Sequence, residues 1–270
     1  MFRFRPIALN QNTCTNLDLI QFIKFAKNFN GVELDYEKIK KALSKNYNLK
    51  GIFEILEVYR TKVESIYPLS DFSLCSEREY KTKVLPNFNQ MINYCDKLEC
   101  NLMIATPSLL KDSKETISIP KWRIFNKTRK RLEDLSKRAS KEDINIGFEF
   151  PISDYSSVSN LYDAKEVLKP LESQENLGYI IDTFYFAKFD VNFDEISDIR
   201  KLIYLIKLAD FNEDLVENEN RLFPGEGNFN FDKFYRYLEK IGYHRIFSIE
   251  LSKNGCSEKL LEKFSIIFKY

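Results

Sequence analysis

The sequence predicts an α/β protein that forms a single (β/α)8 barrel domain across residues 1–270. Short apolar segments alternate with amphipathic helical segments, and the alternation repeats every ~30 to 40 residues, the size of one βα unit. Eight of the apolar segments qualify as strands, and no linker or second domain interrupts the series. A length of 270 residues suits such a barrel, which needs about 250.

The expected strands are short runs of apolar residues. In chain order they are residues 2–9, 31–34, 63–67, 102–106, 144–150, 177–182, 203–208 and 246–251. Pro68 and Pro107 follow the third and fourth runs. We expect both strands to end there, because proline has no N–H to donate to a sheet.

Between these strands, apolar residues recur at helical spacing. The expected helices are residues 17–29, 37–43, 53–59, 77–98, 122–139, 158–168, 193–200, 231–241 and 258–268. Pro86 falls inside the longest of them, where it can kink the helix. Gly242 ends the segment 231–241.

Charge, apolar content and cysteine pattern limit the partners and the compartment. Lysine and arginine total 41 against 40 aspartates and glutamates, so the chain lacks the basic excess of a nucleic-acid binder. No run approaches the ~20 apolar residues of a membrane-spanning helix. The five cysteines form no Cys-x-x-Cys zinc pair. We therefore expect reduced thiols, a cytoplasmic protein, and neither a nucleic-acid nor a membrane partner.

Charged residues gather at the carboxyl ends of the expected strands. Side chains alternate between the two faces of a strand, which directs Glu149, Lys207 and Glu250 toward the barrel axis. Asp182 is the last residue of its strand, and Glu33 has an inward position near the end of another. Inward charges are costly unless paired, and active sites of parallel barrels lie at this end. The pattern favours a functional site, with surface loop residues as the alternative.

Five short motifs carry a resemblance to a known family. They are Gly147-Phe-Glu149-Phe150, Asp182-Thr-Phe-Tyr185, Ile206-Lys207-Leu208-Ala209-Asp210, the stretch Arg-Leu-Phe-Pro-Gly-Glu-Gly at 221–227, and Glu250-Leu251. The chain resembles the xylose-isomerase-like TIM barrels, the sugar phosphate isomerase/epimerase group, and the resemblance is best from residue 144 onward. It implies a TIM barrel enzyme of carbohydrate metabolism.

The resemblance also implies a metal site that this chain fills only in part. Two glutamates, an aspartate and a histidine hold one divalent metal in the family, and the matching ligands here are Glu149, Asp182 and Glu250. Lys207 stands where the family has the histidine, and the only histidine, His244, is expected at the opposite end of the barrel. We expect no cofactor or a weakly bound Mg²⁺ or Mn²⁺. The trinuclear zinc site of the endonuclease IV branch is excluded, since it needs several histidines.

The resemblance and the charge pattern together give the expected roles of the site residues. Glu149 and Glu250 are expected to be catalytic and to move a proton between carbons, with Lys207 as a charged substitute for the metal. Two alternatives for Lys207 are a Schiff-base nucleophile and an ion pair that only ties the barrel together. The expected substrate-binding residues are Arg221, Tyr185, Glu33 and Asp210. For Arg221 the alternative is a surface ion pair with Glu226.

Two functions of different classes follow. The first is an isomerase or epimerase that acts on a sugar, a sugar phosphate or a polyol through paired glutamates, without the family's metal or with little of it. The alternative is a catalytically silent TIM barrel that binds a small polyol or a protein partner. The expected partner is a small-molecule sugar or polyol, and a homodimer is left open.

Overall fold

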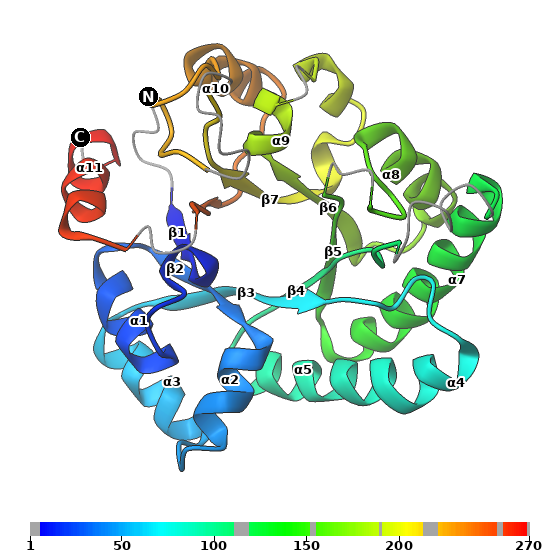
Figure 1. The fold of residues 1–270 in the computed structure, drawn as a ribbon, viewed down its shortest axis with the longest axis horizontal. Coiled ribbons are helices and arrows are strands. Elements are labelled where there is room, and N and C mark those ends of the chain that lie inside the picture. The colour runs from blue at the N-terminus through cyan, green and yellow to red at the C-terminus, as the bar shows by residue number, and fades with distance from the viewer. Residues whose placement is uncertain are drawn as a thin grey trace. The chain divides into compact units, whose positions relative to one another are not determined.

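The computed structural model describes residues 6–110, 119–151, 155–188, 191–212, 221–252 and 256–268. Eight strands form a closed parallel barrel in chain order, β1 to β8 (Figure 1). This confirms the predicted (β/α)8 TIM barrel. The chain divides into two compact units, which we call the first unit (Met1–Glu64 with Ile181–Tyr270) and the second unit (Ser65–Ile180). The expectation of one domain over 1–270 stays a prediction.

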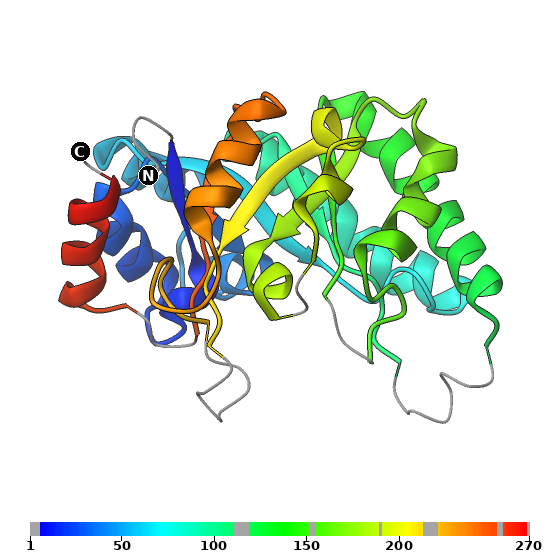
Figure 2. The same ribbon diagram turned by 90° about the horizontal axis from the view of Figure 1, so that it is seen from above.

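The first unit holds β1, β2, β7, β8 and the helices around them. Its strands are β1 (Ile7–Asn10), β2 (Gly31–Asp35), β7 (Ile203–Leu208) and β8 (Phe247–Ile249). Its α-helices are α1 (Leu19–Phe25), α2 (Tyr36–Leu43), α3 (Leu49–Val58), α9 (Thr183–Lys188), α10 (Phe231–Lys240) and α11 (Glu258–Phe268). The first strand pairs in parallel with β2 and with β8, and β8 also pairs with β7. Helix α1 contacts both α2 and α3, and the three lie together in Figures 1 and 2.

Short polar side chains cap the first turns of several helices of the first unit. Asp35, the last residue of β2, accepts a hydrogen bond from the backbone N–H of Lys38 at 2.9 Å and so caps α2. Asp18 and Gln21 form a reciprocal capping box at the start of α1. Asn230 caps α10 in the same way as Asp35 caps α2. These caps fix where α1, α2 and α10 begin.

The second unit carries β4, β5 and most of β3 and β6. The strands are β3 (Lys62–Leu69), β4 (Leu102–Ala105), β5 (Asn145–Glu149) and β6 (Leu177–Asp182). The α-helices are α4 (Glu77–Glu79), α5 (Leu85–Lys97), α7 (Lys121–Ala139) and α8 (Leu161–Leu168). Within the unit, β4 pairs in parallel with β3 and β5, and β5 pairs with β6. Glu149 is opposite Ile180 in the last of these pairings.

The sequence predictions fail where proline or a short helix is involved. Pro68 lies inside β3 and does not end it, and the strand continues to Leu69. The expected helix 77–98 is divided into α4, a π-turn over Tyr80–Val84, and α5. The π-turn lies just before Pro86, which has no N–H for the regular helical pattern. Helix α9 follows β6 without a loop and was not predicted. Residues 2–5 of the expected first strand lie outside the described residues.

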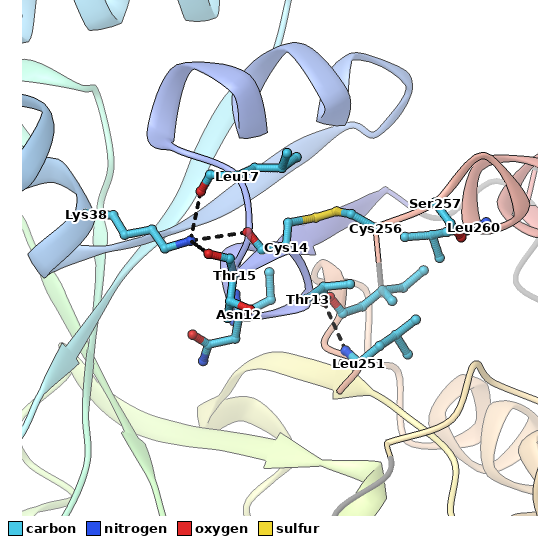
Figure 3. The surroundings of a disulfide bond; sticks show 12 residues. Asn12, Thr13, Cys14, Thr15, Leu17, Lys38, Leu251, Cys256, Ser257 and Leu260 are labelled. Carbon is cyan, nitrogen blue, oxygen red and sulfur yellow. Dashed lines mark hydrogen bonds between the residues drawn. A yellow bond between two sulfur atoms is a disulfide. The ribbon is translucent and has the colours of Figure 1, made fainter. Parts of the chain in front are cut away.

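The cysteine expectation is corrected by the structure. Cys14 and Cys256 form a disulfide across a sequence separation of 242, with Cα atoms 5.1 Å apart (Figure 3). The bond ties the 3-10 turn η1 (Gln11–Cys14), which follows β1, to the segment before α11. Cys75, Cys95 and Cys100 are free. Among the helices of the described residues, none has the length and apolar character needed to cross a membrane.

Candidate functional site

Two adjacent strands of the first unit bring a lysine and a glutamate together. Lys207 of β7 is paired in register with Ser248 of β8, and both side chains are buried as strand alternation predicts. Glu250 follows β8 directly, two residues after Ser248 and on the same side by alternation. Lys207 Nζ lies 2.8 Å from Glu250 Oε2, and the lysine side chain is only 2% exposed. The pair is therefore formed inside the protein.

Glu250 has a second partner on the turn after β1. Asn12 Nδ2 donates a hydrogen bond to Glu250 Oε1 at 3.2 Å. The hydroxyl of Thr13 accepts from the backbone N–H of Leu251 at 3.0 Å, and this contact holds the same turn against the end of β8 (Figure 3). Both carboxylate oxygens of Glu250 are thus oriented by named groups. The sequence reasoning missed Asn12, although an Asn-x-Asn run directly after a strand was available as a signal.

A second ion pair lies at the end of β6. Arg221 Nη1 is 2.7 Å from Asp182 Oδ2, with the aspartate side chain 2% exposed. The other aspartate oxygen accepts the backbone N–H of Phe184 at 3.0 Å. The guanidinium lies over the ring of Phe184, 4.6 Å from its centroid, and 5.4 Å from that of Tyr185. Arg221 is therefore paired with Asp182 and packed against two aromatic rings.

The two ion pairs are neighbours. One carboxylate oxygen of Asp182 lies within 4.8 Å of one carboxylate oxygen of Glu250. Asp182 Oδ2, Arg221 Nη1 and Glu250 Oε2 are buried, and none of them makes a hydrogen bond of ordinary geometry. Their ion-pair distances show charge pairing, whereas the angles leave hydrogen-bonding capacity unused. A bound hydroxyl or carbonyl group can use that capacity, because buried polar atoms are otherwise satisfied in folded proteins.

The pairing sets the charge states of the three buried groups. Burial raises the pKa of Asp182, and the charge of Arg221 opposes this only in part. Burial acts to raise the pKa of Glu250 as well, but Lys207 and Arg221 outweigh it and lower that pKa to about 2. Burial acts to lower the pKa of Arg221, yet Asp182 and Glu250 raise it. Glu250 is therefore a firmly ionised carboxylate, and Asp182 is the acid of the pair that accepts a proton more readily.

The other residues singled out from the sequence lie on several different elements. Glu149 is the last residue of β5, is half-buried, and belongs to the second unit. Tyr185 lies in α9, half-buried beside Arg221. Glu33 on β2 is fully buried and accepts a hydrogen bond from Asn10 Nδ2 at 2.9 Å. His244 is exposed and precedes β8, at the opposite end of that strand from Glu250. This position matches the one expected for the only histidine.

Asp210, expected to bind substrate, organises the loop that contains the Pro-Gly motif. Its Oδ2 accepts the backbone N–H groups of Gly225 and Gly227, both at 2.9 Å. Its Oδ1 accepts those of Phe211 and Phe229 at 2.8 and 3.0 Å. Four bonds fill the acceptor sites of a carboxylate. The loop also requires its glycines: Gly225 has a φ of +91°, and a Cβ at Gly227 would overlap the Phe211 carbonyl oxygen.

Arg221 does not use the alternative partner considered from the sequence. Glu226 is paired with Lys263 of α11. The backbone N–H of Arg221 donates to Ser252 Oγ at 2.6 Å, and the Arg221 carbonyl accepts from the Ser252 N–H at 3.3 Å. Arg221 is therefore held by its backbone to the segment after β8 and by its side chain to Asp182.

The family implies a divalent metal, and the donor set of this site can be tested against it. Asp182 and Glu250 are suitable oxygen ligands. However, Lys207 and Arg221 each lie within 2.8 Å of one of these carboxylates. A protonated lysine and an arginine have no lone pair to offer a metal. The charges of these four residues already cancel. The residues present in the first unit therefore do not fit a resident divalent ion.

Comparison with known proteins places the chain in a family. A family model described as "Xylose isomerase-like TIM barrel" matches residues 22–263. An inosose isomerase of Bacillus velezensis is 26% identical over 211 residues, which cover 77% of this chain and 73% of that protein.

Solved structures share the fold at lower sequence identity. The IOLI protein with a bound zinc atom has a TM-score of 0.84 at 19% identity, covering 98% of this chain and 100% of that one. The 3-keto-D-glucoside 4-epimerase YcjR from E. coli has a TM-score of 0.75 at 14% identity, with 97% of each chain covered. The family match spans most of the sequence, and it agrees with the observed barrel. The chain belongs to the xylose isomerase-like TIM barrel family.

Proposed function

We propose that the protein is a sugar or polyol isomerase or epimerase that works at the carboxyl ends of its strands. The observation that carries this proposal is the pair of adjacent buried ion pairs, Lys207–Glu250 and Arg221–Asp182. Inosose isomerase relatives and an epimerase of the same fold support the reaction class. A catalytic role also gives a reason for burying four charges, which is costly for the fold alone.

The proposed reaction removes a proton from one carbon and adds a proton to carbon again. A carboxylate removes the proton from a carbon that carries a hydroxyl and lies next to a carbonyl, and the electron pair shifts to the carbonyl oxygen. The Lys207 ammonium stabilises the charge that develops there. A proton is then added to the former carbonyl carbon while the hydroxyl proton passes to the former carbonyl oxygen, which gives isomerisation. Alternatively, an acid on the opposite face adds a proton to the first carbon and the carbonyl re-forms, which gives epimerisation. No oxidant or reductant is needed.

The charge states decide which carboxylate does which task. Glu250, with a pKa lowered to about 2, is a weak base while Lys207 is beside it. We therefore assign the first proton transfer to Glu149, the carboxylate at the end of β5. Glu250 keeps Lys207 charged and in place, and Arg221 with Tyr185 binds substrate hydroxyls. Asp210 and Glu33 are proposed to position the site through their contacts, since the carboxylate of Asp210 is filled by backbone donors.

The experiment is solvent deuterium exchange, followed by NMR, with a panel of keto-polyols and keto-sugars in D2O. We expect deuterium to enter at the carbon beside the carbonyl, and Glu149→Gln to reduce its rate by about 10²–10⁴-fold, the usual contribution of a general base. The matched control is Glu142→Gln, an exposed glutamate at the turn before β5. No exchange with any panel member, at protein concentrations where binding is seen, would contradict the proposal.

A second candidate function is favoured by one observation. Both oxygens of Glu250 already have partners in Lys207 and Asn12, as expected of a site that binds but does not catalyse. In that case the protein is a silent barrel that binds a small polyol. Calorimetric binding of a polyol without deuterium exchange supports this candidate over the enzyme.

A further inference from the structure

We infer that two built-in cations, Lys207 and Arg221, occupy the electrostatic place of the family's divalent metal, so that this protein works without a resident metal ion. The inference deepens the proposed function where it concerns catalysis. Its metal-binding part rests on the ion pairs alone. It starts from the mismatch between the family's ligand set and the residues found here.

The four charged side chains of the site neutralise one another. Asp182 and Glu250 contribute two negative charges, and Lys207 and Arg221 contribute two positive charges. A metal cation bound to the same carboxylates would stand next to both cations, in an interior where charges are screened weakly. Since the carboxylates are already neutralised, the attraction that normally holds the metal is offset by repulsion from these neighbours.

Arg221 keeps its positive charge and is held in place by several contacts. Its guanidinium stays protonated at all ordinary pH values. Its backbone is bonded to Ser252 in both directions, and its side chain lies over the Phe184 ring at 4.6 Å. The side chain is 16% exposed, against 2% for Asp182. Asp182 is thus matched with a fixed cation, and a metal would have to displace that cation from a packed position.

Lys207 stands where the family has a histidine ligand. A lysine ammonium binds a metal only after it loses a proton. Glu250 Oε2, 2.8 Å away, favours the protonated form instead. Lys207 is 2% exposed on β7, between Ile206 and Leu208 in a fully buried strand. Its ammonium therefore stays at the end of the strand, beside Glu250, as a fixed positive charge.

The ion pairs also offer hydrogen-bonding atoms to a substrate. Asp182 Oδ2, Arg221 Nη1 and Glu250 Oε2 retain hydrogen-bonding capacity despite their charge pairing. A vicinal hydroxyl and carbonyl have the complementary groups, since a hydroxyl can donate to a carboxylate and a carbonyl can accept from a cation. The geometry thus points to direct recognition of substrate oxygens by side chains.

The test measures metal on the full-length protein without substrate. Wild-type protein, dialysed against Zn²⁺ or Mn²⁺ and then against buffer, is analysed for metal content and titrated by calorimetry. We expect sub-stoichiometric metal in the wild type. Lys207→His supplies the missing ligand and removes a cation, so we expect at least about tenfold tighter binding of Mn²⁺. Lys207→Gln, which only removes the cation, is expected to show a smaller gain.

Control variants separate the site from general effects. Lys201→His adds a histidine at an exposed position before β7 and is expected to bind metal as the wild type does. Circular dichroism checks that each variant is folded. Stoichiometric metal in the dialysed wild type would overturn the inference. So would a folded Lys207→His and a folded Lys207→Gln that both bind Mn²⁺ no more tightly than the wild type.

Failure of the metal inference and failure of the isomerase proposal give different experimental results. If no keto-polyol or keto-sugar undergoes exchange, the isomerase proposal fails, while the metal measurements still decide the inference. If exchange is found and is lost after chelator treatment but restored by Mn²⁺, the inference fails and the isomerase proposal stands. Exchange that persists in chelator supports both.

Discussion

Two buried aspartates at the ends of neighbouring strands in chain order have opposite surroundings. Asp210, two residues past β7, accepts four backbone N–H groups and touches no cation among its described contacts. Asp182, at the end of β6, faces the guanidinium of Arg221 and keeps an oxygen without an ordinary hydrogen bond. A carboxylate filled by backbone donors shapes a loop, whereas one that faces a side-chain cation remains available to a ligand.

The largest effect that tests this difference is on catalysis. We expect Asp182→Asn to reduce the exchange rate by about 10²-fold or more, since it removes a charge that positions Arg221 in the site. Asp210→Asn keeps one acceptor oxygen for the loop, and its exchange rate is expected to fall less. The rates are measured by deuterium incorporation under saturating substrate. Equal losses in the two variants would erase the distinction between the two aspartates.

The next effect is on stability. Asp210→Ala leaves the backbone donors of Phe211, Gly225, Gly227 and Phe229 without this acceptor, and we expect the free energy of unfolding to fall by about 3–5 kcal/mol. Urea unfolding measures it. Asp210→Asn serves as the matched control, with a smaller loss. A loss below about 1 kcal/mol for the alanine variant would show that the loop does not depend on this carboxylate.

A smaller and more specific effect is coupling within the Asp182–Arg221 pair. Asp182→Asn alone leaves a buried guanidinium without its partner, and Arg221→Gln alone leaves a buried carboxylate. We expect the double variant to recover about 2 kcal/mol relative to the sum of the single losses. The measurement is a double-mutant cycle from urea unfolding. Additive losses would mean that the two groups do not form a pair in solution.

The pH dependence of stability gives the smallest effect. The pKa of Glu250 is lowered from 4.5 to about 2, so its contribution is fully present above pH 4.5 and is lost as pH falls toward 2. Asp182, whose pKa is raised, acts in the opposite direction and reduces the net change. We expect Glu250→Gln to weaken the acid loss of stability between pH 4.5 and 2. An unchanged acid profile would contradict the lowered pKa.

Regular strands could be predicted because their signal is local. The expected bounds 177–182 and 203–208 are those of β6 and β7, where every residue is buried and most are apolar. Helix α9 was missed because its six residues are too few for a helical period to show. Pro68 was misread because its effect depends on which strand pairs at that position, and the residue sequence alone does not contain that information.

The site could be predicted as a set of residues but not as a set of contacts. Alternation along the strands directed Lys207 and Glu250 to one side, and the structure brings them together. The Arg221–Asp182 pair joins residues that are far apart in the sequence. Three of the four donors to Asp210 come from residues 225–229, more than ten residues further along the chain, and the sequence does not show that they meet this carboxylate. The disulfide spans a separation of 242 residues, so the scattered cysteines gave no sign of it.

The measurement that tests the central claim most directly is deuterium exchange by chelator-treated protein. The protein is freed of metal with a chelator, its metal content is checked by elemental analysis, and a keto-polyol or keto-sugar that exchanges before treatment is then incubated with it in D2O. Fixed cations at Lys207 and Arg221 predict that deuterium enters the carbon beside the carbonyl at the rate seen before treatment, and that added Mn²⁺ does not raise this rate. A rate that vanishes with the metal and returns with it would contradict the claim.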